Sequence, residues 1–182
     1  MPETPNPAQP MQVPPEVARY LQGALPESRQ FDFLIGQWDV SATRYKEDGT
    51  PLLQYKASWN AVHLNEGRMV MDDFKALAPT GQPVSSYVTL RTYSEVTQRW
   101  EMTGLQALQP AGATEWKGKF EEGEMRLDVT GKDPAGNAVK TKIRFFEISK
   151  DAFKWESSMS RDDGKTWRKT AALAASRVVA NS

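Results

Sequence analysis

The chain has 182 residues, which is enough for one substantial hydrophobic core and too few for two ordinary domains. Lysine plus arginine and aspartate plus glutamate number 23 each, so the sequence lacks the excess of positive charge with which nucleic-acid-binding proteins neutralise phosphates. Cysteine is absent, which excludes disulfides, thiolate nucleophiles and metal sites built from cysteine.

The N-terminal segment divides into a tail and a short helix. Residues 1–15 are rich in proline and poor in apolar side chains, so we expect a disordered tail. Pro15 can open a helix, and Val17 and Leu21 follow at helical spacing. Residues 16–30 are therefore predicted to form a helix and a linker.

The sequence gives no sign of a membrane span. No apolar run approaches the roughly 20 residues of a transmembrane helix, and the start has neither the basic nor the apolar region of a signal peptide. We expect a cytoplasmic protein, or a periplasmic one if a signal peptide was removed before this numbering begins.

From Gly36 onward the hydrophobic pattern has a period of two, which is typical of strands with one buried face. Trp38, Val40 and Ala42 alternate with polar residues, and a turn then leads into a second strand that ends near His63. Eight further candidate strands are separated by glycine, proline, aspartate or asparagine. They lie near residues 66–75, 84–93, 97–106, 114–121, 124–130, 138–148, 152–159 and 166–177.

About ten sequential strands joined by short turns indicate an up-and-down antiparallel meander. An open sheet of this size would leave two unpaired edges, so we predict an all-β, closed or nearly closed barrel over residues 31–178. Trp116 and Phe120 share one face of their strand and Glu115 and Lys117 the other, which predicts an aromatic interior and a charged exterior. An immunoglobulin-like sandwich is the main alternative, although it normally has fewer strands.

The segment before and into the first strand carries a family resemblance. Residues 31–40 read FDFLIGQWDV, and the apolar part before Gly36 is predicted to pack as a plug against one end of the barrel. With the second tryptophan at Trp59, the run resembles the opening of bacterial calycin-like barrel domains of unknown function that share an FDFLxGxW start. More distantly it resembles lipocalins, fatty-acid-binding proteins and nitrobindins. The resemblance implies a ten-stranded barrel around a pocket and implies no particular reaction.

The resemblance to nitrobindins does not extend to a cofactor. Their pattern continues with further glycines after the tryptophan and uses a histidine late in the chain as the haem ligand. Here Val40 and Ala42 follow Trp38, and His63 is the only histidine. We therefore expect no haem and no other obligatory cofactor.

Residues 160–167 match the S-x-D-x-G-x-x-W pattern of a hairpin found in sialidase-type propellers. The pattern occurs once, so it indicates neither a propeller nor sialidase chemistry. We interpret it as a fold-forming turn in which Asp162 caps the backbone, Gly164 takes a positive φ and Trp167 packs back over the hairpin.

Aromatic residues at inward positions are the main candidates for a ligand pocket, although the same rings would also fill a solid core. Inward polar residues, identified as Thr141, Glu147, Ser157 and Lys169, favour a pocket because a dry core would have to satisfy each of them. The predicted ligand-binding residues are Trp38, Trp59, His63, Asp72, Trp100, Trp116 and Trp155.

His63 and Asp72 are the polar members of this set. A single histidine excludes a metal site with several histidines, and His63 is interpreted as a hydrogen-bonded rim residue in preference to a general base or a haem ligand. Asp72 and Asp73 are adjacent, so at most Asp72 faces inward. A solvated rim position is favoured for Asp72 over burial beside a partner such as Arg91.

Three functions follow from these features. The leading hypothesis is the binding of a small hydrophobic or amphipathic molecule inside the barrel. The second is a small isomerase or hydrolase that uses His63 or Asp72 as a general base. The third is a filled barrel that acts through its outer surface, for example as a homodimer. No metal site and no nucleic-acid partner are expected.

Overall fold

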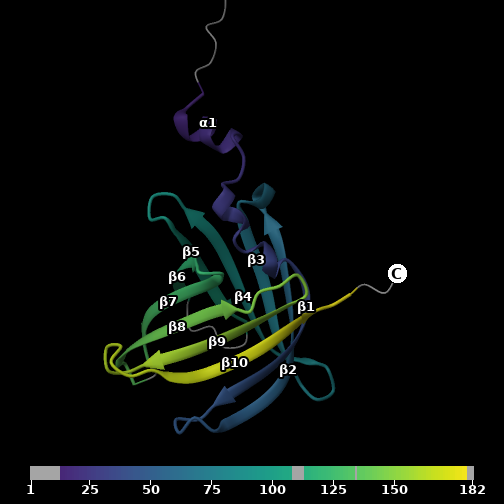
Figure 1. The fold of residues 1–182 in the computed structure, drawn as a ribbon, viewed down its shortest axis with the longest axis vertical. Helices are drawn as coiled ribbons and strands as arrows, with labels where there is room; N and C mark the ends of the chain where they lie inside the picture. The colour runs from purple at the N-terminus through teal and green to yellow at the C-terminus, as the bar shows by residue number, and fades with distance from the viewer. Residues whose placement is uncertain (1–12, 108–112, 134, 180–182) are drawn as a thin grey trace, which may run out of the picture.

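The computed structural model describes residues 13–107, 113–133 and 135–179 and shows ten strands in one closed barrel (Figure 1). Most of the predicted tail, residues 1–12, lies outside the described residues. The strands are β1 (Gly36–Tyr45), β2 (Pro51–Leu64), β3 (Met69–Leu77), β4 (Pro83–Ser94), β5 (Arg99–Gln106), β6 (Thr114–Glu121), β7 (Glu124–Lys132), β8 (Ala138–Phe146), β9 (Ala152–Ser160) and β10 (Arg168–Arg177). The helical elements are α1 (Pro15–Leu21) and the 3₁₀ helices η1 (Pro26–Arg29), η2 (Asp32–Leu34) and η3 (Asn65–Gly67).

Every strand pairs antiparallel with its neighbours in the sequence, and pairing of β1 with β10 closes the sheet. Trp38 on β1 lies opposite Trp59 on one side and Arg177 on the other. The prediction of a ten-stranded up-and-down barrel with a short N-terminal helix is confirmed. The sandwich alternative is wrong, because the strands form a single closed sheet and not two packed layers.

Alternation along the strands separates the interior from the exterior. On β1, Trp38, Val40 and Ala42 are buried, whereas Asp39 and Ser41 are exposed. The same two-residue period continues around the barrel, because each strand must present its apolar side chains to the enclosed core. The predicted aromatic interior and charged exterior follow from this pattern.

The N-terminal segment closes one end of the barrel, as the apolar run before Gly36 predicted. Figure 1 shows this segment running from α1, which stands outside the barrel, onto the barrel's end. Phe31 and Leu34 are completely buried there. The Phe31 ring meets the Trp100 ring edge-on, with centroids 4.7 Å apart. We call residues 30–35 the plug.

Polar contacts fix the plug to the strands. The indole Nε1 of Trp38 donates to the carbonyl of Leu34 at 2.8 Å, and that of Trp100 donates to Gln30 Oε1 at 3.0 Å. Buried indole N–H groups need such acceptors, so the plug supplies both packing and hydrogen bonds. Among the residues described, no helix is long and apolar enough to cross a membrane.

The β9–β10 hairpin contains the predicted turn motif. Asp162 accepts hydrogen bonds from the backbone N–H of Thr166 at 2.9 Å and from its hydroxyl at 2.6 Å. Ser160 Oγ donates to Asp162 at 2.8 Å and accepts from the N–H of Gly164, whose φ is +92°. Trp167 Nε1 donates to the carbonyl of Gly164 at 3.0 Å. These bonds bear out a fold-forming role for the motif.

Asp162 makes the hairpin sensitive to acid. Hydrogen bonds from Thr166 lower the pKa of Asp162 to about 2. A carboxyl group with a lowered folded-state pKa stabilises the fold above its ordinary pKa, and the stabilisation disappears as the pH falls through the lowered value. We expect Asp162→Asn to lower Tm at pH 7, and we expect this difference from wild type to shrink as the pH falls toward 2.

Thermal unfolding followed by circular dichroism across this pH range tests the expectation. Asp163→Asn is the matched control, because the Asp163 carboxylate makes a surface ion pair with Lys140. The control should leave Tm nearly unchanged. Equal losses in both variants, or a loss for Asp162→Asn that does not depend on pH, would contradict the assigned role.

Candidate functional site

The barrel is hollow in the half opposite the plug. A cavity of about 1510 Å³ lies there, lined by side chains from all ten strands, and it reaches the β3–β4 turn at residues 78–81. Tyr55, Phe74, Met102 and Ile143 contribute to a largely apolar wall. The barrel is therefore not filled along its whole length: large rings pack the plug end, and an open cavity occupies the other.

Small residues on the inner face keep this half open. Ala42, Ala76 and Ala171 line the cavity where larger side chains would occupy it. Gly104 on β5 has a more specific role, because a Cβ atom there would lie 2.5 Å from the Tyr87 hydroxyl and 2.6 Å from the Trp116 ring. The missing side chain lets both rings pack against the barrel wall.

A buried ion pair lies at the inner end of the cavity. Arg91 on β4 and Asp72 on the neighbouring β3 are 4% and 1% exposed, and Arg91 Nη1 forms an ion pair with Asp72 Oδ2. The other carboxylate oxygen, Oδ1, accepts a hydrogen bond from Trp59 Nε1 at 2.9 Å. Asp72 is therefore buried beside an arginine, and the rim position that the sequence favoured is wrong.

The two charges of this pair differ in their access to the cavity. Arg91 belongs to the cavity lining, whereas Asp72 does not and lies behind Arg91 and Trp59. Burial lowers the pKa of Arg91 to about 9, so the guanidinium still carries its charge at neutral pH. The ring of Phe31 in the plug lies 4.9 Å from Arg91 Cζ, which places the guanidinium between the plug and the cavity.

Several neutral polar groups accompany Arg91. Tyr87 and Thr89, on the same face of β4, line the cavity, as do Thr141 and Ser157 on the far side. Burial raises the pKa of the Tyr87 phenol, which therefore stays protonated at physiological pH. The Ser157 and Thr170 hydroxyls lie 2.6 Å apart and satisfy one another. The cavity thus combines an apolar wall with a few fixed polar groups, as small-molecule sites do.

The structure divides the predicted tryptophans between the two halves of the barrel. Trp59, Trp116 and Trp155 line the cavity. Trp38 and Trp100 belong instead to the packed core at the plug end, where their indole nitrogens bind the plug backbone and Gln30. Their assignment to a ligand pocket is corrected to a structural role in holding the plug.

His63 also lies at the plug end. Its Nε2 is 3.0 Å from Asp32 Oδ1 on η2, and His63 is not part of the cavity lining. A base at this position cannot reach a molecule in the cavity, so the interpretation of His63 as a pocket base or pocket ligand contact is corrected. The geometry agrees with the favoured interpretation of His63 as a hydrogen-bonded residue at the rim of the barrel.

Two of the polar residues assigned to the interior face outward. Lys169 pairs with Glu156 at 2.7 Å on the outer surface, and Glu147 pairs with Lys154 at 2.6 Å. A bulge between Lys169 and Ala171 shifts the alternation on β10, and Glu147 follows the end of β8 with a φ of +49°. Both irregularities reverse the direction that simple alternation assigns.

Arg91 belongs to the candidate site, although the sequence predicts it only as one possible partner of a buried Asp72. The sequence does contain a signal for an inward Arg91, because Arg91 alternates with Tyr87, Thr89 and Tyr93 along one face of the same strand. A charged residue within an inward series indicates a paired or functional group, because an unpaired buried charge is costly.

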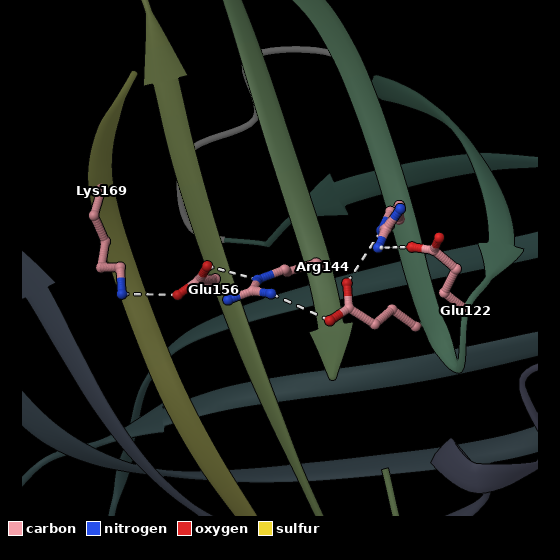
Figure 2. Close-up of polar contacts among 6 residues, drawn as sticks. Glu122, Arg144, Glu156 and Lys169 are labelled. Atoms are coloured by element: carbon pink, nitrogen blue, oxygen red, sulfur yellow. Dashed lines mark hydrogen bonds and ion pairs between the residues drawn. The ribbon is translucent and has the colours of Figure 1, made fainter. Parts of the chain in front are cut away.

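The outer surface carries a second polar cluster, shown in Figure 2. Alternating charges run across strands β7 to β10 and the β6–β7 turn, in the order Lys169, Glu156, Arg144, Glu124, Arg126 and Glu122. Arg144 is central, at 2.7 Å from Glu156 and 3.2 Å from Glu124. Each charge in the row has a neighbour of opposite sign, so this cluster stabilises strand pairing and offers no unpaired group to a ligand.

No group of three or more histidine, cysteine, aspartate or glutamate side chains among the residues described is placed to hold a metal ion. The cavity is accordingly the candidate site, and Arg91 is the one deeply buried charge among the lining residues that the structure describes.

Comparisons with known proteins agree on the fold. No model of a known protein family matches the chain, and no curated protein matches it by sequence. Among solved structures, Rv2717c from M. tuberculosis superposes with a TM-score of 0.57 at 15% identity, over 86% of this chain and 99% of that one. An S-type phycobiliprotein lyase from Guillardia theta gives 0.56 at 12% identity, over 88% and 97%. These superpositions show a shared β-barrel fold, and at such low sequence identity they show nothing beyond the fold.

Proposed function

We propose that this barrel binds a small hydrophobic or amphipathic molecule in its cavity. The observation that carries the proposal is the open cavity of about 1510 Å³, with aromatic side chains in its wall and Arg91 at its inner end. Sites for small molecules are typically about 300–1,000 Å³, so the cavity has more than enough room for one, and they combine an apolar wall with a few polar groups in the same way. Trp59, Trp116 and Trp155 would contact the ligand's apolar part.

The alternatives receive less support. A general base at His63 would not meet a substrate in the cavity, since His63 contacts the plug. Asp72 is already held by an ion pair with Arg91 and a hydrogen bond from Trp59. A shared fold with a protein named as a lyase does not transfer its reaction, because one barrel fold serves many functions. We also propose kinship with the barrel family that shares the FDFLxGxW start, on the strength of residues 31–38.

Titration with N-phenyl-1-naphthylamine tests binding, because this uncharged probe brightens when it enters an apolar site. We expect saturable binding with a stoichiometry near one. In Ala171→Trp the added indole enters the cavity, because Ala171 is part of its wall. We expect this variant to weaken binding by about tenfold or more, which corresponds to about 1.4 kcal/mol.

Ala174→Trp is the matched control, because Ala174 lies on the same strand but is exposed on the outer face. The control should bind the probe as wild type does. Absence of saturable binding to the wild-type protein, or an equal loss of affinity in both variants, would overturn the proposed cavity site.

A further inference from the structure

The inner end of the cavity offers a charged hydrogen-bond donor that is not fully used. Arginine has five N–H donors in a planar fork. Arg91 Nη1 forms an ion pair with Asp72, but neither Nη1 nor Nε has a hydrogen-bond partner among the described residues. Arg91 is only 4% exposed, so bulk water does not compensate for the unused donor.

Both oxygens of Asp72 already have a partner within the protein. Arg91 forms an ion pair with one of them and Trp59 donates to the other. Asp72 also lies behind the cavity wall, so a ligand meets the guanidinium and not the carboxylate. The complementary group on a ligand must therefore accept hydrogen bonds from Arg91.

The charges of Arg91 and Asp72 determine which kind of hydrogen-bond acceptor on a ligand suits this position. Arg91 and Asp72 together carry no net charge, and they are the only charged residues that are buried among those the structure describes. The other cations of the cavity lining, Arg44 and Lys56, are exposed. A ligand carboxylate would add a third, uncompensated charge at a buried position, and removing that charge from water is unfavourable. A neutral carbonyl oxygen avoids that cost and still accepts a hydrogen bond from a charged donor, the stronger kind.

We infer that the cavity takes an uncharged amphipathic molecule that enters polar end first and places a carbonyl oxygen against Arg91. The inference rests on the proposed binding function and specifies its ligand class. The apolar remainder of the molecule lies along Trp116, Trp155 and Leu173, which line the wall toward the cavity mouth. Ketones, esters, lactones and tertiary amides share this chemistry.

Three nine-carbon probes test the inference by displacing N-phenyl-1-naphthylamine at pH 7.5. These are 2-nonanone, with a neutral acceptor; nonane, with none; and nonanoate, with a charged one. We expect 2-nonanone to bind about tenfold more tightly than nonane, after correction for their different transfer from water, and more tightly than nonanoate. The factor corresponds to one charge-assisted hydrogen bond.

A double variant separates the hydrogen bond from general affinity. Arg91→Met with Asp72→Asn removes both charges while leaving an amide oxygen for Trp59 Nε1. In this variant 2-nonanone should lose its advantage over nonane, while the naphthylamine still binds. The ¹³C resonance of carbonyl-labelled 2-nonanone should move downfield on binding the wild-type protein, as hydrogen-bonded carbonyls do, and less on binding the variant.

The outcomes distinguish the inference from the function on which it rests. If the naphthylamine binds but 2-nonanone and nonane compete equally, the cavity site stands and the carbonyl assignment is wrong. Preference for nonanoate would likewise overturn it in favour of an acidic ligand. If the naphthylamine itself does not bind, both the function and the inference fail.

Discussion

Arg91→Met alone should destabilise the barrel by about 3–5 kcal/mol, because it leaves a buried carboxylate without its cation. Asp72 is 1% exposed, and its remaining hydrogen bond comes from the neutral indole of Trp59. Adding Asp72→Asn removes the isolated charge and should recover most of the lost stability. Urea unfolding followed by tryptophan fluorescence gives both free energies of unfolding.

Arg161→Met provides the comparison at the surface. Arg161 forms an ion pair with Asp133 at 3.3 Å; the Arg161 side chain is 55% exposed and that of Asp133 is 4% exposed. Without Arg161, Asp133 keeps the hydrogen bonds that it accepts from the backbone N–H groups of Ala135 and Asn137. Ion pairs of an exposed arginine contribute about 1 kcal/mol or less, so this variant should remain close to wild type. If Arg91→Met were no more destabilising than Arg161→Met, or if Asp72→Asn failed to restore stability, the Arg91–Asp72 pair would not form the inner end of the cavity as described.

Phe31→Ala should cost about 3–5 kcal/mol, the range for truncating a fully buried phenylalanine. Phe31 has no exposed surface, its ring meets the rings of Trp100 and Phe145, and it lies against the guanidinium of Arg91. Its removal loosens the plug and exposes the closed end of the barrel to water. The free energy of unfolding in urea measures the loss.

Phe120→Ala is the matched control, because Phe120 near the end of β6 is 36% exposed. This substitution should cost about 1 kcal/mol or less. Similar losses for the two phenylalanines would show that the plug contributes no more than a surface ring, contrary to the packing described for residues 30–35.

The strands could be predicted from the sequence because alternation is a local signal. Each strand needs one apolar face, so Trp116 and Phe120 identify their own strand without knowledge of its neighbours. Closure followed from the number of strands and the cost of unpaired edges. The plug also followed locally, since residues 31–35 are too apolar to remain in an exposed loop.

The position of each inward residue along the barrel axis could not be predicted in this way. Trp38 and Trp155 have the same inward parity, yet Trp38 packs beneath the plug and Trp155 lines the cavity. Depth depends on the register between strands and on which end the plug enters, and both are long-range properties. His63 was placed in the pocket for the same reason.

Pairing across strands and backbone irregularities account for the remaining errors. Asp72 is buried because the β3–β4 register brings Arg91 beside it, a match that alternation on either strand does not reveal. Lys169 faces outward because a bulge interrupts β10. Neither the register nor the bulge follows from the local hydrophobic pattern.

Indole N–H resonances test the central claim, binding inside the open half of the barrel, most directly. The six tryptophans provide six ¹H–¹⁵N signals, three from residues lining the cavity, two from the plug end and one from the β9–β10 hairpin. On titration with 2-nonanone or N-phenyl-1-naphthylamine, the signals of Trp59, Trp116 and Trp155 should shift while those of Trp38 and Trp100 remain in place. Shifts confined to Trp38 and Trp100, or no shift at saturating probe, would contradict a ligand site in this cavity.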